Sequence, residues 1–429
     1  MSALGPRLAA VKIIAHTLAG GATHSAPSLD HLSTQERAYA YQLTQGTLNA
    51  APKLQGYLRQ LLTTPLKAKE TEVKAVILAG LYQLSAMRTP DHAAVNESVE
   101  LAKKLKKTWS LKLVNACLRR FTRERERLEN GLSESEQSAH PSWLFNIITG
   151  QWPEKANEIL AANNQPGPLC LRVNEQAISR SAYAALLDEA NLTYELSSLA
   201  ESCIRLKQNI TVHELPGFLD GWVSVQDEAA QLAASLLRIE TGHKVLDACS
   251  APGGKACHIA EQNPKIDLIA QDVSPERLLK VNDNKARLGL TFKIEETPTE
   301  AFGQIPCFDR ILADVPCSGT GVIRRHPDIK LLRQHSDLEQ FHRQQLSILK
   351  FLWPQLSPGG ELLYVTCSIV KQENDQTIDT FLEQTPSAEH EPIAADWGVQ
   401  TSRGRQLLPS LDGADGLYFS RLKKSATHR

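Results

Sequence analysis

The sequence is 429 residues long, and 42% of its residues are apolar and 22% charged, which is an ordinary composition for a globular protein. Its formal net charge is −1, so the chain as a whole has no basic field that would attract nucleic acid, and any surface for a polyanion must be local. The eight cysteines lack framework spacing and the apolar stretch at the N-terminus is short and interrupted by charges, which argues against a disulfide scaffold, a signal peptide and a membrane span. We therefore expect a cytoplasmic protein of two or three domains.

The first segment, residues 1–135, contains one amphipathic helix pattern after another and no strand-like run. Val73, Ile77, Leu81 and Leu84 recur at the spacing of three to four residues that a core-facing helix stripe requires. The stretch from Leu111 to Phe121 repeats this spacing. The segment is therefore expected to form an all-α domain.

A basic run lies near the end of this helical segment. Residues 101–127 contain ten Lys or Arg residues and only two Glu. On a helix, Lys112, Arg119 and Arg123 fall on one face, opposite the apolar stripe, and phosphate contacts need such a stripe of cations. We expect this face to bind RNA; the alternative is an ordinary solvated helix face.

Two further segments follow with different patterns. Residues 136–220 mix helices with short extended runs and are expected to form a small α/β connector. From residue 221 to 429, apolar runs alternate with helical stretches, which predicts a mostly parallel sheet covered by helices in a Rossmann-like arrangement. The expected strands are Lys244–Cys249, Asp267–Val273, Asp309–Val315, Glu361–Cys367 and, more weakly, Thr291–Glu296.

Each of the four strong runs ends in polar or reactive side chains. These are Asp247 with Cys249, Asp272, Asp314 with Cys317, and Cys367. Ligands of parallel α/β sheets bind outside the carboxyl ends of the strands, so we expect the functional site at this edge.

The stretch "DACSAPGGK" (Asp247–Lys255) follows the first strand and opens a helix. Gly253 and Gly254 allow a ligand to approach the backbone, and Asp272, at the end of the next strand, suits a ribose hydroxyl pair. The spacings of dinucleotide and phosphate loops are absent. The pattern suggests S-adenosylmethionine, with an unspecialised strand-to-helix turn as the alternative; Asp247 is expected to brace the turn.

Cys317 and Cys367 stand in similar settings, each directly after an expected strand. Neither belongs to a C-x-x-C pair, so zinc binding and redox exchange are disfavoured. Each cysteine alone could be a buried structural residue. Beside a methyl-donor turn, however, two thiols suit methylation of cytosine carbon 5, in which one thiolate adds to carbon 6 and a second thiol helps the adduct to be released.

The motifs "DACSAPGGK", "DVPCSGTG", "RRHPD" and "TCS" together resemble the ribosomal RNA cytosine-C5 methyltransferases of the Sun/Fmu type (RsmB/NOP family). The stretches "LAGLYQL", "VNACLRRF" and "HPSWL" resemble its NusB-like N-terminal half. The resemblance covers essentially the whole chain. It implies a NusB-like helical RNA-binding domain, a connector and a catalytic domain that uses S-adenosylmethionine.

The resemblance also implies roles for individual residues. Cys367 corresponds to the nucleophile, Cys317 to the thiol that assists release, and Asp314 to the acid near the sulfonium and the target base. Asp272 corresponds to the ribose ligand. The methyl-donor loop corresponds to Cys249, Ser250, Ala251, Pro252, Gly253, Gly254 and Lys255.

Three further residues are candidates for contacts with the RNA or the cofactor. Arg324 and Arg325 directly follow the loop of Cys317, so we expect them to hold phosphates that flank the target base. An acid that contacts the adenine side of the cofactor is expected in the family shortly after the third strand, and Thr297 stands there. Glu295 or Glu296 could replace that acid, or Thr297 could offer its hydroxyl.

The sequence thus predicts formation of 5-methylcytosine in small-subunit ribosomal RNA, by resemblance at position 967 of that RNA. Two alternatives remain: a methyltransferase for transfer RNA, DNA or another nucleic acid, and a non-catalytic NusB-like RNA-binding factor. We expect small-subunit ribosomal RNA as the partner, a monomer, no metal and no membrane contact.

Overall fold

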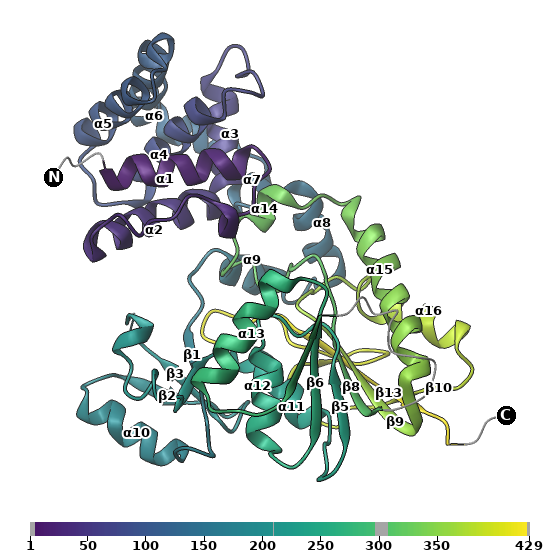
Figure 1. Cartoon of the computed structure of the whole chain (residues 1–429). Coiled ribbons are helices and arrows are strands. Elements are labelled where there is room, and N and C mark those ends of the chain that lie inside the picture. The colour runs from purple at the N-terminus through teal and green to yellow at the C-terminus, as the bar shows by residue number, and fades with distance from the viewer. Residues whose placement is uncertain (1–4, 209, 297–307, 427–429) are drawn as a thin grey trace. The chain divides into compact units, whose positions relative to one another are not determined.

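The computed structural model describes residues 5–208, 210–296 and 308–426, and the chain forms two compact units (Figure 1). Unit 1 comprises Met1–Pro166 together with Ile323–His335, and unit 2 comprises Gly167–Val322 together with Ser336–Arg429. A short segment from the catalytic half of the sequence therefore belongs to the helical unit. The sequence-based division at residues 135 and 220 stays a prediction.

Unit 1 contains helices and no strand among its described residues, which agrees with the all-α fold expected for residues 1–135. Its α-helices are α1 (Gly5–Leu18), α2 (Thr34–Asn49), α3 (Ala51–Leu61), α4 (Thr71–Ala86), α5 (Asp91–Lys104), α6 (Leu111–Asn130), α7 (Glu134–Gln137), α8 (Ser142–Gln151), α9 (Ala156–Asn163) and α14 (Ile329–Leu332). Two 3₁₀ turns, η1 (Thr23–Ser25) and η2 (Thr108–Ser110), lie between them.

Helix α4 is the centre of the apolar core of unit 1. Its residues Val73, Ile77 and Leu81 are fully buried, and α1, α2, α3, α5 and α6 all pack against it. Gly80 allows α6 to approach closely, because a Cβ there would lie 2.8 Å from the Leu118 side chain. The buried stripe predicted from the sequence therefore holds the unit together.

The segment Ile323–His335 is anchored to unit 1 by buried polar groups. Asp328 accepts hydrogen bonds from the Thr23 backbone N–H at 3.0 Å and from its hydroxyl at 2.9 Å. The Lys330 ammonium group, 2% exposed, donates to Asn49 and to Asn164. Burial holds the pKa of Lys330 well below its ordinary value.

The first part of unit 2 is a small antiparallel sheet with α10 (Arg180–Glu189) packed against it. The strand order is β2-β3-β1-β4, and neighbouring strands run antiparallel. Their bounds are β1 (Leu169–Val173), β2 (Tyr194–Leu196), β3 (Cys203–Leu206) and β4 (Val223–Val225). This is the α/β connector expected from the sequence.

The main sheet of unit 2 has nine strands in the described part of the chain, in the order β11-β12-β13-β9-β8-β5-β6-β7, with β10 beside β13. From β9 to β7 neighbours are parallel, whereas β13 runs antiparallel to β9. The bounds are β5 (Lys244–Asp247), β6 (Asp267–Asp272), β7 (Lys293–Glu296), β8 (Phe308–Asp314), β9 (Leu356–Thr366), β10 (Ala388–Glu391), β11 (Val399–Gln400), β12 (Arg405–Gln406) and β13 (Tyr418–Lys424).

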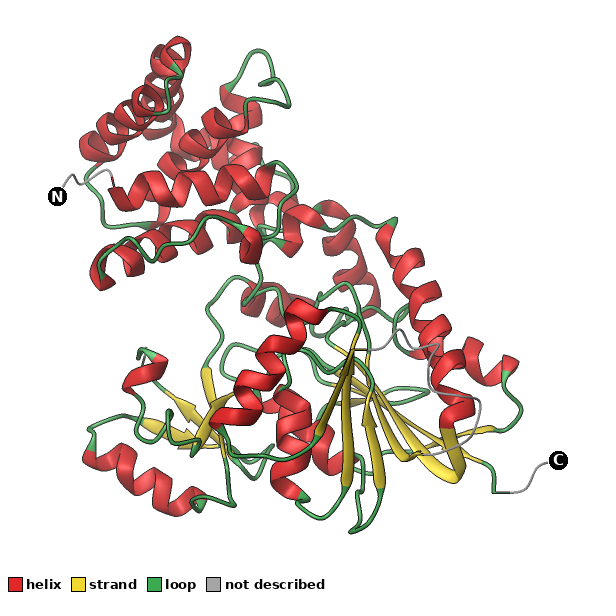
Figure 2. Ribbon diagram, viewed as in Figure 1, coloured by secondary structure: helices red, strands yellow, loops and turns green. Residues whose placement is uncertain are grey.

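Helices cover both faces of this sheet (Figure 2). Helices α11, α12 and α13 share one buried apolar cluster with the sheet, and α15 and α16 share another. The bounds are α11 (Glu228–Leu236), α12 (Gly254–Gln262), α13 (Pro275–Arg287), α15 (Asp337–Leu352) and α16 (Asp375–Gln384). The mostly parallel, doubly covered architecture predicted from the alternating pattern is confirmed.

Candidate active site

The carboxyl ends of four adjacent parallel strands bring the predicted site residues to one edge of the main sheet. Asp247 ends β5, Asp272 ends β6 and Asp314 ends β8, while Cys367 follows β9 directly. Cys317 lies three residues beyond Asp314. This edge is where a parallel α/β sheet binds its ligand.

The turn between β5 and α12 needs glycine at one position. Gly253 has a φ of 96°, in the left-handed region, and a Cβ there would lie 3.0 Å from the Val281 backbone of α13. Both conditions exclude a larger side chain without strain. Gly254 then begins α12, so the turn presents the N-terminus of this helix.

Asp272 is held beside this turn. Its carboxylate, 3% exposed, accepts hydrogen bonds from the Ala251 N–H at 3.1 Å and the Ser274 N–H at 3.0 Å. Arg277 lies 3.6 Å away and also donates to the Ala251 carbonyl. Carboxylate lone pairs remain for a ribose hydroxyl pair, which supports the predicted role.

Asp247 is a buried carboxyl group for which the described residues show no hydrogen-bond partner on either oxygen. Burial, and secondly the charge of Asp314, raise the pKa of Asp247 from 3.8 to about 7. A buried polar group without a partner is costly unless a ligand satisfies it. A cationic or hydrogen-bond-donating ligand would satisfy this carboxyl group, and the bracing role expected from the sequence stays a prediction.

Lys255 and Asp314 form an ion pair with 2.5 Å between Nζ and Oδ2. Burial alone would lower the pKa of Lys255, but the Asp314 carboxylate and, less strongly, Cys367 and Asp247 outweigh it and raise that pKa. Lys255 is thus a fixed positive charge that acts on both the carboxylates and the Cys367 sulfur.

The two predicted thiols meet. Cys317 and Cys367 have Sγ atoms 3.2 Å apart, and both side chains are partly exposed. The hydrogen bond with Cys367, followed by burial, raises the pKa of Cys317 well above its ordinary value. By contrast Cys249 does not join the pair, and burial raises the pKa of its thiol.

The two cysteine loops are tied together by a buried acid that sequence reasoning missed. Glu373, fully buried, accepts from the Ser318 N–H at 2.7 Å, from the Ser318 hydroxyl at 2.5 Å and from the Ser368 hydroxyl at 2.6 Å. The residues it grips are the direct neighbours of Cys317 and Cys367. No spacing rule flags this residue, because its role arises only when the loops fold onto each other.

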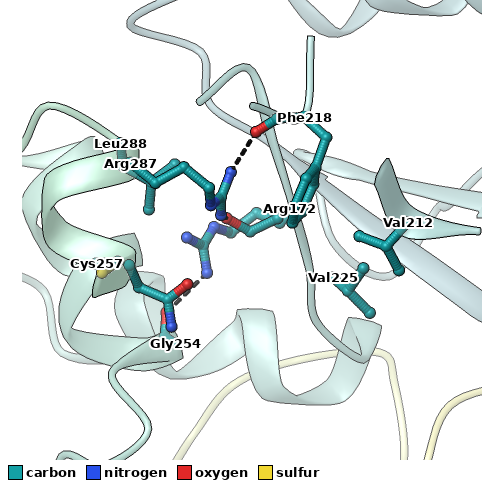
Figure 3. A pocket seen from close by; sticks show the side chains of 10 residues that line it. Arg172, Val212, Phe218, Val225, Gly254, Cys257, Arg287 and Leu288 are labelled. Carbon is teal, nitrogen blue, oxygen red and sulfur yellow. Dashed lines mark hydrogen bonds between the residues drawn. The ribbon is translucent and has the colours of Figure 1, made fainter. Parts of the chain in front are cut away.

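Arg172 is a second residue that the sequence does not predict for the site, and it stabilises the methyl-donor turn. Arg172 of β1, 1% exposed, pairs with Glu261 of α12 at 2.7 Å and donates to the Gly254 carbonyl at 2.7 Å. With Arg287 it lines a cavity of about 210 Å³ (Figure 3). Arg287 donates to the carbonyls of Phe218 and Val223 and to a serine hydroxyl, so this pair of arginines braces the structure.

The other predicted residues lie as follows. Lys112, Arg119 and Arg123 are exposed on α6, and Arg324 is 6% exposed within unit 1. Thr297 lies outside the described residues. Glu295 and Glu296 end β7, where Glu296 is the register partner of Asp272.

No helix in the described part of the chain combines the length and the apolar character of a transmembrane span.

Three parts of the chain match models of known protein families. Residues 234–423 match the family described as 16S rRNA methyltransferase RsmB/F, residues 6–123 the NusB family, and residues 140–213 the ferredoxin-like domain of RsmF/B-like methyltransferases. The chain is 43% identical to "Ribosomal RNA small subunit methyltransferase B" of Pseudomonas putida, over 99% of this chain and 100% of that protein. It is 42% identical to the protein of the same name from Vibrio cholerae, over 92% and 90%.

Solved structures share the fold. The structure titled "Crystal Structure of PH0851" has a TM-score of 0.81 at 19% identity and covers 97% of this chain and 99% of its own. That of NSun6 from Pyrococcus horikoshii with SFG has a TM-score of 0.61 at 19% identity and covers 67% and 99%.

Proposed function

The chain belongs to the 16S rRNA methyltransferase RsmB/F family, and we propose that it forms 5-methylcytosine in small-subunit ribosomal RNA. The single observation that carries the choice of carbon 5 is the contact between Cys317 and Cys367 at the carboxyl edge of the sheet. A methyltransferase for a nitrogen or oxygen atom needs no thiol, because those atoms are nucleophiles already. The relatives named as small-subunit methyltransferases support the choice of RNA.

The residues present fit S-adenosylmethionine as the methyl donor. Asp272 suits the ribose hydroxyls, and the unsatisfied Asp247 carboxyl suits a positively charged part of the donor. When bound, the donor supplies an electrophilic methyl group on a sulfonium centre. Asp247, Asp272 and Asp314 together favour a cation at this edge.

Cys367 is the proposed nucleophile. As a thiolate, Cys367 adds to carbon 6 of the cytosine at the same sheet edge as the Lys255–Asp314 ion pair. The ring becomes an enamine whose carbon 5 would take the methyl group as the bond between that group and the donor's sulfur breaks. Asp314, partly exposed at the end of β8, is placed to hold the protonated ring nitrogen.

Release needs the carbon 5 proton to leave and the bond from carbon 6 to Cys367 to break. A solvent water takes up the carbon 5 proton, and the electron pair of that C–H bond restores the ring double bond and expels the thiolate. Cys317, 3.2 Å from Cys367, is the proposed helper, because its thiol can donate a hydrogen bond to the departing sulfur. Its raised pKa keeps it protonated for that task.

The proposed RNA contact in unit 1 is the α6 face of Lys112, Arg119 and Arg123, since all three side chains are exposed. A cytoplasmic location is proposed as well, because small-subunit RNA is made and modified there in bacteria such as those of the named relatives.

Bisulfite sequencing of ribosomal RNA tests the proposal. A strain that lacks the gene should lose protection of one small-subunit cytosine, expected at position 967, and the wild-type gene but not its Cys367→Ala variant should restore it. Protection lost in a transfer RNA would instead assign the enzyme to that substrate. Unchanged protection in every RNA would favour a non-catalytic RNA-binding factor.

A further inference from the structure

A large aromatic side chain lies on the surface of unit 1 at the start of α6. Trp109, in the 3₁₀ turn η2, is 56% exposed. Its neighbour Ser110 is fully buried, and Val114 and Leu118 further along are core residues, so the turn is anchored while the indole points outward. An exposed tryptophan leaves apolar surface in contact with water and contributes little to the stability of the fold. Such a side chain on the surface indicates a contact with a ligand or partner.

Trp109 continues the basic face of α6. The turn η2 runs directly into the helix, and Trp109, Lys112, Ala116, Arg119 and Arg123 follow one another at alternating spacings of three and four residues. At 3.6 residues per turn these five positions fall within an arc of about 80° and span about 21 Å. All five are exposed, so the indole stands at one end of a continuous stripe.

The charged residues from Leu101 to Arg123 are all cationic. No Asp or Glu occurs between Leu101 and Arg123, although the net charge of the chain is −1. The next acid along the helix, Glu124, is bound by Arg120 at 3.1 Å and by Arg127. Its charge is thereby compensated by two arginines. Glu126, exposed three residues beyond Arg123 on the same face, ends the cationic stripe.

We propose that Trp109 is a stacking platform for an unpaired base of the RNA substrate, placed so that the cations of α6 hold the phosphates that follow this base. Base-on-aromatic stacking beside a row of cations is how single strands are held without regard to sequence. The inference rests on the proposed function and deepens it. It assigns single-stranded RNA to unit 1 and places it along α6.

RNA-binding measurements with the full-length chain test this assignment. The probes are a fluorescently labelled single-stranded RNA oligonucleotide and the duplex of the same sequence. Trp109→Ala should weaken single-strand binding by about 5- to 150-fold, the effect of losing one stacked base. Trp109→Phe, which keeps a stacking ring, should recover most of the loss.

Salt dependence and a matched variant separate stacking from other effects. Trp109→Ala removes no phosphate contact, so the slope of log affinity against log salt should stay as in wild type. Tyr41→Ala is the control, because Tyr41 is 57% exposed on α2, whose only charged residues are Glu36 and Arg37. This variant should bind both probes like wild type.

Three outcomes would overturn the inference. One is unchanged single-strand affinity in Trp109→Ala, and another is an equal loss for the duplex, in which base faces are covered. A third is unchanged affinity for naked RNA together with weaker binding to ribosomal assembly particles, which would assign the indole to a protein partner. None of these touches the proposed function, which fails only if the wild-type chain methylates no cytosine of small-subunit RNA.

Discussion

The sulfur atoms of Cys317 and Cys367 lie 3.2 Å apart, although 50 residues separate them in the sequence. At this distance the two thiols share one position at the sheet edge, and either can hydrogen-bond to the other. A thiolate on Cys367 would keep a donor beside it throughout a reaction cycle. The pair is therefore suited to a bond that must form and then break.

Variants of the two cysteines should differ in kind. Cys367→Ala should abolish both methyl transfer and any covalent RNA adduct, because no nucleophile remains for carbon 6. Cys317→Ala should allow addition but slow release, so a protein–RNA species should accumulate. Denaturing gels detect this covalent species, and Cys117→Ala in unit 1 is the control. An adduct in Cys367→Ala and none in Cys317→Ala would reverse the roles assigned to the two cysteines.

Asp272→Ala should weaken methyl-donor binding by about 1–3 kcal/mol, because ribose hydroxyls would lose a charged acceptor. Titration calorimetry with S-adenosylmethionine measures this. Asp267 begins the same strand, is exposed and pairs with Lys293, so Asp267→Ala is a matched control that should bind the donor normally. Equal affinity in both variants would place the ribose elsewhere.

Glu373→Gln should slow formation of the covalent adduct without loss of the fold. The amide keeps the size of the side chain, but one oxygen acceptor becomes a donor, so the grip on Ser318 and Ser368 weakens. A displacement of the two cysteine loops by a fraction of an ångström should slow the single-turnover rate by about 10- to 100-fold.

The affinity of Glu373→Gln for the methyl donor should stay near that of wild type, since this acid does not touch the donor turn. Glu383→Gln, at an exposed position of α16, is the control. A single-turnover rate in Glu373→Gln equal to that of the control would reduce Glu373 to a purely structural residue.

Substitution of Lys112, Arg119 and Arg123 by Gln should weaken RNA binding to a similar degree for different sequences. The slope of log affinity against log salt should fall by about 0.7–0.9 for each phosphate that is no longer neutralised. The KM for RNA should rise more than kcat falls, since the chemistry lies in unit 2. The control is a triple Gln variant at Lys12, Lys67 and Lys69, which are exposed in the same unit. An unchanged salt slope in the α6 variant would mean that this helix face is only solvated and does not bind RNA.

Asp247 should make the stability of the unliganded protein depend on pH. Its pKa is about 7 in the folded state, whereas the ordinary value is 3.8, so between these values the unfolded chain loses a proton that the folded chain keeps. This group therefore lowers stability progressively as pH rises from about 4 to about 7, by at most about 4 kcal/mol. Below about pH 4 it has no effect.

Asp247→Asn removes the titration. We expect the free energy of unfolding of this variant, measured with urea in the absence of methyl donor, to increase relative to that of wild type as the pH rises from about 4 to about 7. A difference between the two proteins that is constant with pH would show that Asp247 ionises normally in the fold.

The catalytic edge could be predicted because its signals are local. Each strong strand is an apolar run, and Asp247, Asp272, Asp314 and Cys367 follow from where these runs end. The sequence does not predict the strands β10 to β13: Ala388–Glu391 reads Ala-Glu-His-Glu and lacks an apolar run, and two others have only two residues each. Strand β13 pairs with β9, β10 and β12 pair with β13, and β11 pairs with β12, so these strands depend on partner edges and not on a local pattern.

The supports of the site escaped prediction for a similar reason. Glu373 and Arg172 are charged residues that would be expected at the surface, and only tertiary contacts bury them. The position of Arg324, directly after the Cys317 loop, predicts a role at the RNA phosphates, whereas the structure buries its side chain and assigns the segment to unit 1. Neither the composition nor the periodicity of the sequence indicates that this segment packs in unit 1.

Lys330 is hydrogen-bonded to Asn49 and Asn164, which are synthesised long before it. Unit 1 therefore cannot finish folding in the order in which its residues are synthesised. A growing chain releases the first 166 residues of unit 1 early, yet its last piece, Ile323–His335, emerges only after β5, β6, β7 and β8 have been made. Until then Asn49, Asn164 and Thr23 lack the partners they have in the finished protein. Cutting the gene after residue 166 would not yield a complete helical unit, and a fragment meant to represent it must carry the later segment as well.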